Sequence, residues 1–363
     1  MLERVEWGAF RLGDLFVFKA IKQAKSQKII PTDNTINGVP YIIQSTANNM
    51  FSRNVNKQWL IDNNEAPVSG NRIVLGVTLP AVSYQPKEFG ASQVITATSD
   101  WLNENLGKFI AMSISKLMYK FSYGKKPGIE IYKKLTIQLP TKNGEIDFDF
   151  MENFINDLEA QRIAQLDAYL VENGLDDYHL TAEEQQVLEQ FENDKVEWGE
   201  FKLGALFEIN TYKKRFDANK VSISEIGKPY VVRTSLNNGI RGYINEDKQY
   251  LNDGNTISFG QDTATMFYQE KPYFTGDKIK ILKSKDSRFN KKNGLYFIST
   301  MTKSFSSFSW GRSSFSIKII GNQPMKLPTK NKKPDYETME ILISAIQKTA
   351  IKDVVLYVEK KKK

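Results

Sequence analysis

Leu139-Pro140-Thr141-Lys142-Asn143 returns unchanged 188 residues later as Leu327-Pro328-Thr329-Lys330-Asn331. A short turn and a stretch with helical periodicity follow each copy, from about Asp149 and about Asp335. At this shift the apolar positions of the two stretches coincide, so both helices carry the same apolar face. Each face needs a partner, and the simplest partner is the other helix. We therefore expect the helices to pair through Phe154, Ile155, Leu158, Ile163, Leu166 and Leu170 in the first and Leu342, Ile343, Ile346, Ile351, Val354 and Val358 in the second.

The sequence before each helix is also repeated. Its short runs rich in Ile, Val, Tyr and Phe, separated by Gly, Asn and Pro, are typical of strands. Three pairs of segments show the repeat: 7–16 with 198–207, 40–43 with 229–232, and 71–76 with 255–260. The sequence predicts an α+β fold of two similar β-rich domains, each followed by a long helix. The expected segments are domain 1 (1–146), helix 1 and a connector (147–195), domain 2 (196–334) and helix 2 (335–363).

The composition is that of a soluble globular protein with an anionic partner. Of the 363 residues, 40% are hydrophobic and 25% are charged, which is ordinary for such proteins. No run of about 18 apolar residues indicates a membrane span, and the N-terminus lacks the apolar core of a signal peptide, so a cytoplasmic location is expected. The net charge of +8 favours an anionic partner, of which nucleic acid is the commonest.

Several kinds of active site are excluded by composition. The chain has no cysteine, and His179 is its only histidine. The lack of cysteine excludes disulfides and thiolate zinc sites. With a single histidine, catalytic triads and His-rich metal sites are excluded as well. His179 lies in an acidic connector and is interpreted as a surface residue, while Asp147 and Asp149 are interpreted as acids at a helix start and not as metal ligands. We expect no catalytic residue, no metal and no cofactor.

These features together resemble a known family. The motif Trp7-Gly8-x-Phe10-x-Leu12-Gly13-x-Leu15-Phe16, its copy from Trp198, and the Leu-Pro pairs before both helices are similar to the specificity subunit of Type I restriction-modification enzymes. The chain is also similar to the specificity subunit of related two-subunit restriction enzymes that cut on both sides of their site. The resemblance covers essentially the whole chain and rests on the paired order of the motifs, because no single motif is specific.

The resemblance implies a non-catalytic subunit that determines DNA sequence specificity. Each β-rich domain would be a target recognition domain that reads one half of a bipartite, asymmetric target in double-stranded DNA. The two long helices would pair antiparallel with pseudo-twofold symmetry. Modification (methyltransferase) subunits, two of them, would dock on the helices, and restriction nuclease subunits are a further partner that the family allows. A helix of about 23 residues spans roughly 35 Å, close to one turn of B-DNA, which agrees with a split target.

The expected DNA contacts are polar or basic residues in loops that follow strands, because phosphates and base edges are contacted by such side chains. In domain 1 the candidates are Gln44, Ser45, Thr46, Thr78, Tyr123, Lys125 and Lys126. In domain 2 they are Lys213, Lys214, Arg215, Arg233, Thr234, Ser235, Arg241, Gln261, Thr263, Trp310, Arg312 and Ser313. Gln44 and Arg233, like Lys125 and Arg312, occupy equivalent positions in the repeat.

Two other functions stay open on the sequence alone. The chain could be a nuclease whose active site is not recognised, or a scaffold or decoy protein that binds methyltransferase subunits without reading sequence. DNA cleavage by the purified chain would distinguish the first, and the absence of a specific footprint would distinguish the second.

Overall fold

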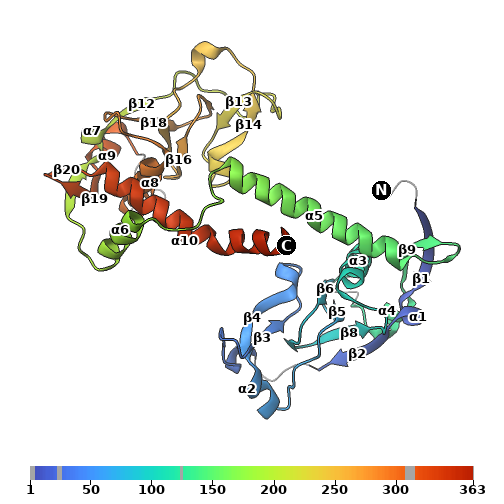
Figure 1. Cartoon of the computed structure of the whole chain (residues 1–363). Coiled ribbons are helices and arrows are strands. Elements are labelled where there is room, and N and C mark those ends of the chain that lie inside the picture. The colour runs from blue at the N-terminus through green and yellow to red at the C-terminus, as the bar shows by residue number, and fades with distance from the viewer. Residues whose placement is uncertain (1–4, 23–26, 123–125, 307–314, 363) are drawn as a thin grey trace. The chain divides into compact units, whose positions relative to one another are not determined.

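The computed structural model describes residues 5–22, 27–122, 126–306 and 315–362 of the chain. The chain divides into two compact units, Met1–Gln165 and Leu166–Lys363. Each unit contains a β-rich domain, and each domain is followed along the chain by a long helix (Figure 1). No helix among the described residues is long and apolar enough to span a bilayer.

The first β-rich domain and its helix contain eighteen elements in the described residues. In chain order they are β1 (Glu6–Arg11), α1 (Leu12–Leu15), β2 (Val17–Ile21), η2 (Gln27–Ile29), β3 (Gly38–Ile42), η3 (Asn48–Met50), β4 (Phe51–Asn56), α2 (Lys57–Asp62), β5 (Arg72–Gly76), β6 (Val82–Gln85), β7 (Gly90–Ala91), β8 (Val94–Thr98), α3 (Glu104–Ser115), η4 (Met118–Lys120), α4 (Ile129–Lys134), β9 (Thr136–Lys142), β10 (Glu145–Ile146) and α5 (Phe148–Glu172).

The connector and the second domain repeat this order with few changes. The elements are α6 (Ala182–Glu192), β11 (Trp198–Lys202), α7 (Leu203–Leu206), β12 (Phe207–Thr211), β13 (Lys228–Val231), η5 (Asn237–Gly239), β14 (Ile240–Ile244), η6 (Lys248–Tyr250), β15 (Thr256–Gly260), β16 (Met266–Gln269), β17 (Phe274–Thr275), β18 (Ile279–Ser284), α8 (Lys291–Phe305), α9 (Ile317–Asn322), β19 (Pro324–Lys330), β20 (Lys333–Pro334) and α10 (Tyr336–Lys362).

The strand orders of the two domains are the same. The first domain has sheets β1-β9-β10, β2-β8-β5-β6 and β4-β3-β7, and the second has β11-β19-β20, β12-β18-β15-β16 and β14-β13-β17. In each domain one β-bulge interrupts the pairing directly after the repeated tyrosine, at Tyr41/Ile42 and at Tyr230/Val231. The predicted fold, two β-rich halves each followed by a long helix, is confirmed.

Repeated polar side chains hold the two domains in the same shape. Asn71 precedes β5 at a positive φ of 57°, donates to the carbonyl oxygen of Leu102 at 2.7 Å and accepts from the Tyr84 hydroxyl at 2.8 Å. Asn255 does the same in the second domain, with a φ of 51° and bonds of 3.1 Å to Phe289 and 2.9 Å from Tyr268. Asparagine tolerates left-handed backbone and can donate and accept at once, which explains why the repeat keeps it.

Each long helix begins at an aspartate and packs first on its own domain. Asp147 accepts a hydrogen bond from the backbone N–H of Phe150, and Asp335 accepts one from Thr338, so both serve as N-caps. The same hydrogen bond then joins each long helix to an earlier helix of its domain. Asn103 at the start of α3 donates to Glu152 of α5 at 2.5 Å, and Asn290 at the start of α8 donates to Glu340 of α10 at 2.8 Å. The interpretation of Asp147 as a helix-start acid is confirmed.

The apolar stripe of each long helix has two parts with different partners. Phe154 and Ile155 pack in the core of the first domain, and Leu342 and Ile343 pack in the core of the second. These four residues thus pack on their own domains, and their predicted pairing across the two helices stays a prediction. Ile346 is 44% exposed, and Leu158, Ile163, Leu166, Ile351 and Val354 are half-buried.

The C-terminal turns of the two long helices meet within the second unit. Lys362 of α10 forms a 2.8 Å ion pair with Asp167, which lies in the part of α5 that belongs to this unit. Leu170 of α5 and Val358 of α10, which occupy equivalent positions in the repeat, are both buried. The predicted contact between the long helices is confirmed at this point. The four-segment division is not tested by the two packing units, so it stays a prediction.

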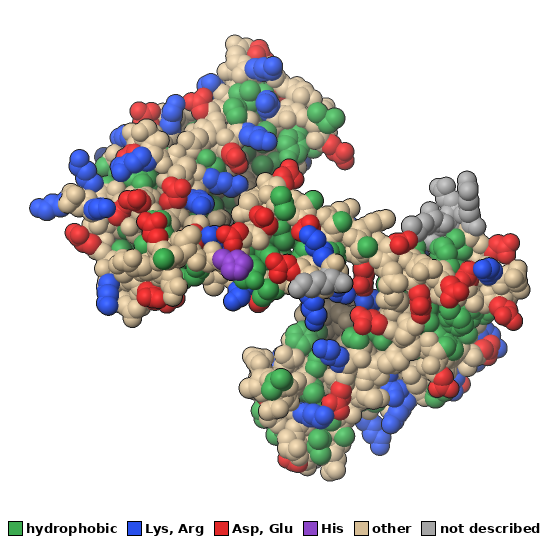
Figure 2. All heavy atoms as spheres, in the orientation of Figure 1, with side chains coloured by type: hydrophobic (Ala, Val, Ile, Leu, Met, Phe, Trp, Pro, Cys, Tyr) green, Lys and Arg blue, Asp and Glu red, His purple; other side chains and the backbone are tan. Residues whose placement is uncertain are grey.

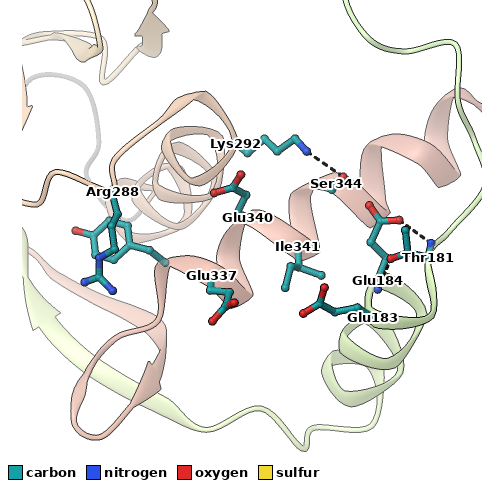
Figure 3. A pocket seen from close by; sticks show the side chains of 10 residues that line it. Thr181, Glu183, Glu184, Arg288, Lys292, Glu337, Glu340, Ile341 and Ser344 are labelled. Carbon is teal, nitrogen blue, oxygen red and sulfur yellow. Dashed lines mark hydrogen bonds between the residues drawn. The ribbon is translucent and has the colours of Figure 1, made fainter.

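Helix α6 of the connector packs on α10. Thr181 and Glu184 form a capping box, with bonds of 3.1 Å and 2.8 Å to each other's backbone N–H. Glu184 is buried and accepts from Lys348 of α10 at 3.0 Å, and Lys348 also pairs with Asp177 at 3.2 Å. A cavity of about 570 Å³ remains between α6, α10 and the start of α8, and its walls carry acidic side chains of α6 and α10 opposite Arg288 and Lys292 (Figure 3).

Hydrogen bonds and the charge of Lys348 lower the pKa values of two carboxyl groups in this connector. Burial alone would raise the pKa of Glu184, but hydrogen bonds from Thr181, Ser344 and Lys348, with the charge of Lys348, lower it below its ordinary value. The pKa of Asp177 is lowered mainly by the backbone N–H of His179 and by Lys348. His179 itself is exposed, as predicted for a surface residue.

Candidate nucleic-acid interface

Gln44, just after β3, holds the loop that follows β5. Its side-chain oxygen accepts hydrogen bonds from the backbone N–H groups of Val77 at 2.8 Å, Thr78 at 2.6 Å and Leu79 at 3.2 Å. The hydroxyl of Thr78 donates to the same oxygen at 2.8 Å. Because these donors surround one oxygen, the carbonyl end of Gln44 positions the loop, and Thr78 and Leu79 are the groups that this loop presents.

Arg233 occupies the equivalent position after β13 and makes an equivalent connection with charge. Its guanidinium is 2.5 Å from the Asp262 carboxylate, which lies in the loop between β15 and β16. Lys278 reaches the same carboxylate at 2.8 Å, and Asp277 lies 3.8 Å from Arg233. The hydrogen bond from Lys278 is the main cause of the lowered pKa of Asp262, and the charges of Lys278 and Arg233 add to it. The strand end and the loop are thus joined by one amide in the first domain and by an ionic network in the second.

Four of the predicted contacts come together in the second domain. Arg215, Arg233, Arg241 and Thr263 line an open pocket of about 510 Å³, together with Asp277. Three guanidinium groups around one opening form a local concentration of hydrogen-bond donors that suits phosphate oxygens or the acceptor edge of guanine. We call this opening the arginine pocket.

The residues of the arginine pocket differ in how strongly they are engaged. Arg233 is held by Asp262, and Arg215 lies 3.7 Å from Asp277. Within the described residues, Arg241 forms no hydrogen bond or ion pair, and its side chain is exposed. The floor of the pocket is Tyr230, whose hydroxyl donates to the carbonyl oxygen of Phe216 at 2.8 Å and whose pKa is raised by burial. Arg241 is therefore the guanidinium with the least competition from its own chain.

The neighbouring basic residues are placed by backbone and aromatic contacts. The ammonium group of Lys214 lies over the rings of Phe216 and Tyr250, 4.9 Å and 4.3 Å from their centroids. The backbone N–H of Lys213 donates to Asn252 at 3.1 Å, and the Lys213 side chain is exposed. Lys213 is thus the more available of these two lysines.

The remaining polar candidates mostly stabilise turns. Ser45 accepts from the N–H of Ala47 and Thr234 accepts from the N–H of Leu236, the same two-residue turn in both domains. The N–H of Gln261 donates to the carbonyl oxygen of Lys278, and the hydroxyls of Thr263 and Thr265 are 2.9 Å apart. Thr46, Ser235 and Lys126 are exposed. Tyr123, Lys125, Trp310, Arg312 and Ser313 lie outside the described residues.

Sequence reasoning missed several charged residues of these surfaces. The candidates from the sequence do not include Asp262, Asp277 and Lys278, although Asp262 lies between the candidates Gln261 and Thr263. In the first domain, Lys19, Lys22 and Arg72 line a pocket of about 730 Å³. The Lys19-x-x-Lys22 spacing at the end of β2 is the sequence signal for this pocket.

Basic and acidic side chains are mixed on the visible face of the molecule and form no single basic face there. Figure 2 shows Lys and Arg side chains interspersed with Asp and Glu on the visible side of both units. Among the described residues, no group of three or more His, Asp or Glu side chains is arranged to hold a metal ion.

Comparison with known proteins gives the relationship of the chain. A family model described as the Type I restriction modification DNA specificity domain matches it twice, over residues 4–168 and 195–356. Over 160 residues the chain is 32% identical to the specificity subunit S.BcgI of a Type II restriction enzyme from Heyndrickxia coagulans. That match covers 42% of this chain and 45% of the relative, so the chain spans less than half of the length of the curated protein that it matches.

A solved structure has the same fold. The S subunit of a Type I restriction-modification system from M. genitalium superposes with a TM-score of 0.64 at 15% identity, covering 99% of this chain and 93% of that one. The two matches to the family model take in both β-rich domains and most of both long helices. The chain belongs to the Type I restriction-modification DNA specificity family and carries the family's domain twice.

Proposed function

We propose that this chain is the non-catalytic DNA specificity subunit of a restriction-modification complex. Each β-rich domain reads one half of a bipartite, asymmetric target in double-stranded DNA. The long helices pair antiparallel and set the distance between the two readers. Methyltransferase subunits, two per chain, dock on this helical region and supply the chemistry, and nuclease subunits are further candidate partners.

The observation that carries the proposal is the pair of equivalent loops in the two domains. The frame around them is the same, down to Asn71 and Asn255 and the single β-bulge. The residue that holds the loop differs between the domains. Gln44 accepts hydrogen bonds from the backbone N–H groups of Thr78 and Leu79, whereas Arg233 lines the arginine pocket. A common frame with different side chains at one position supports two readers of different half-sites.

The proposed contacts remain those predicted from the sequence, with an order of importance that the geometry supports. Arg241 and Lys213 are the phosphate contacts in the second domain, because both are exposed and Arg241 has no competing partner among the described residues. Arg233 is a base-reading candidate held ready by Asp262, since a guanidinium can contact guanine in a bidentate manner. Lys125 and Arg312, at equivalent positions of the repeat, stay proposals from sequence.

Selection from a pool of random duplexes tests the proposal. The purified chain, together with a methyltransferase subunit encoded beside it, should enrich duplexes with two different short motifs at one fixed spacing. The chain alone, with Mg²⁺ and plasmid DNA, should neither cut nor methylate. Cleavage by the chain alone would favour the nuclease alternative. A complex that forms but enriches no motif would favour a scaffold that does not read sequence.

A further inference from the structure

We propose that an open apolar groove of the first domain is the docking site for an acidic amphipathic helix of a partner protein. The groove lies between β1, β9, α3 and α5 and has a volume of about 370 Å³. Its walls are Trp7, Phe109, Met112, Lys116, Leu117 and Phe154. We call it the Trp7 groove. The inference goes beyond DNA recognition and does not depend on it.

The Trp7 groove exposes large apolar side chains side by side. Trp7 and Met112 are each 43% exposed. Phe154 is only half-buried, although its ring meets Phe109 edge-on at 5.8 Å. Single exposed hydrophobic residues are common on proteins, but several around one hollow indicate a surface that another molecule covers.

The repeat shows what covers the equivalent surface in the second unit. Trp198 is the counterpart of Trp7, and Leu342 is the counterpart of Phe154. Phe191 of α6 lies against Trp198, with ring centroids 6.1 Å apart. Val187 of α6 packs against the core cluster that contains Leu342, and Leu342 is fully buried. In the second unit α6 therefore packs on the counterpart of Trp7, whereas in the first unit Trp7 borders an open groove.

The chemistry of α6 defines the class of occupant. Its sequence, Ala-Glu-Glu-Gln-Gln-Val-Leu-Glu-Gln-Phe-Glu, places Val187 and Phe191 one helical turn apart on one face and carries four glutamates. The lining of the Trp7 groove also includes Lys116 and Lys120, which are both exposed. An acidic helix with two apolar residues at this spacing matches both the apolar floor and the basic rim.

The occupant comes from another chain. In the part of the chain that the structure describes, α6 is already committed to α10 through Glu184 and Lys348. The proposed occupant is therefore a helix of the same type from a second protein.

A peptide with the sequence of residues 180–195 is the probe. Labelled with fluorescein, acetylated and amidated, it is titrated with the full-length chain and followed by fluorescence anisotropy, with no DNA present. A short helix is marginal in water, so binding should be weak but saturable. Met112→Glu should weaken it at least about tenfold, and Lys116→Glu should weaken it at low salt. A peptide with Val187→Ser and Phe191→Ser should not bind.

A matched control uses a hydrophobic residue outside the groove. Ile131 of α4 is 42% exposed, so Ile131→Glu places the same charge on a similarly exposed position and should leave binding unchanged. Circular dichroism and thermal melting of every variant confirm folding. If Met112→Glu does not fold, Lys116→Glu decides, because Lys116 is exposed.

Three outcomes would overturn the proposal. The first is no saturable binding of the peptide to the parent chain. The second is equal affinity for the parent and for folded Met112→Glu or Lys116→Glu. The third is a parent chain that sediments as a dimer and becomes a monomer with Met112→Glu, which would assign the Trp7 groove to a second copy. Because the assay contains no DNA, failure here leaves the proposed DNA specificity untouched.

Discussion

The two β-rich domains share a frame and differ at two places on it. The shared part is the strand order and the asparagine at the start of β5 and β15, whose hydrogen bonds recur almost atom for atom. One difference is the loop clamp, an amide at Gln44 and an ionic network at Arg233. The other is the Trp7 groove, which is open in the first domain, while in the second domain α6 packs against Trp198, the counterpart of Trp7. The comparison teaches that duplication kept the groups that shape the backbone and varied the groups that face outward.

The largest expected effect concerns the covered and the open apolar surfaces. Leu342→Ala should destabilise the second unit by about 2–5 kcal/mol, because the residue is fully buried and leaves a cavity. Phe154→Ala should cost less, about 1–2 kcal/mol, although it removes a larger side chain, because part of its ring already faces water. Hydrogen exchange with mass spectrometry assigns each loss to its unit. Equal losses would contradict the difference in coverage.

Two equivalent glycines sharpen the comparison of the helix packing. A Cβ on Gly107 would overlap the ring of Tyr84, whereas on Gly294 it would meet Tyr268 less closely. Gly107→Ala should therefore destabilise by about 1–3 kcal/mol, as overpacked sites do, and Gly294→Ala should cost less. Urea denaturation of both variants measures the difference. The reverse order would show that the two tyrosines are not held alike.

The link between α6 and α10 should depend on pH in the acid range. The folded pKa values of Asp177 and Glu184 lie below their ordinary values of 3.8 and 4.5. Their contribution is therefore complete above about pH 4.5 and is lost as the pH falls through the folded values. Amide exchange in α6 should accelerate below that pH.

A variant separates this link from general acid unfolding. Lys348→Met should reduce the pH dependence of α6 and should destabilise the link by more than the roughly 1 kcal/mol typical of exposed ion pairs, because it leaves the buried carboxylate of Glu184 without its counter-ion. The equivalent residue of α5 is Ala160, so the first domain supplies a reference without such a pair. An unchanged pH dependence in Lys348→Met would assign the effect to other groups.

The smallest expected effect is on phosphate contact. Arg241→Ala should weaken DNA binding by a similar factor on all sequences and reduce the slope of log affinity against log salt by about 1. Ser52 is the exposed counterpart at the start of β4 in the first domain, and Ser52→Ala should change neither. A change of sequence preference in Arg241→Ala would make Arg241 a base reader.

Much of the fold could be predicted from the sequence because the same motifs occur in the same order in both halves of the chain. The Leu-Pro-Thr-Lys-Asn copies located both long helices. The partner of the first helical turns could not be predicted in this way. An apolar stripe shows that Phe154 and Leu342 are covered but not by what, and each domain surface covers its own helix start.

The candidate site was less predictable for a related reason. Gln44 and Arg233 were selected as equivalent polar residues, but their hydrogen-bond partners lie about 30 residues away in the chain, in another loop. The acids that hold Arg233 carry no sequence motif, since a single Asp in a turn is common. The arginine pocket appears only when β13, β14 and the two flanking loops are brought together.

The most direct test of the central claim exchanges the clamp residue in one domain. Arg233→Gln gives the second domain the residue that the first domain has at the equivalent position. The duplex motifs selected by the complex of this variant should change in one half only, with the other half and the spacing as in the parent. Changes in both halves, or a target identical to the parent's in a folded variant that still binds, would contradict two independent readers on one repeated frame.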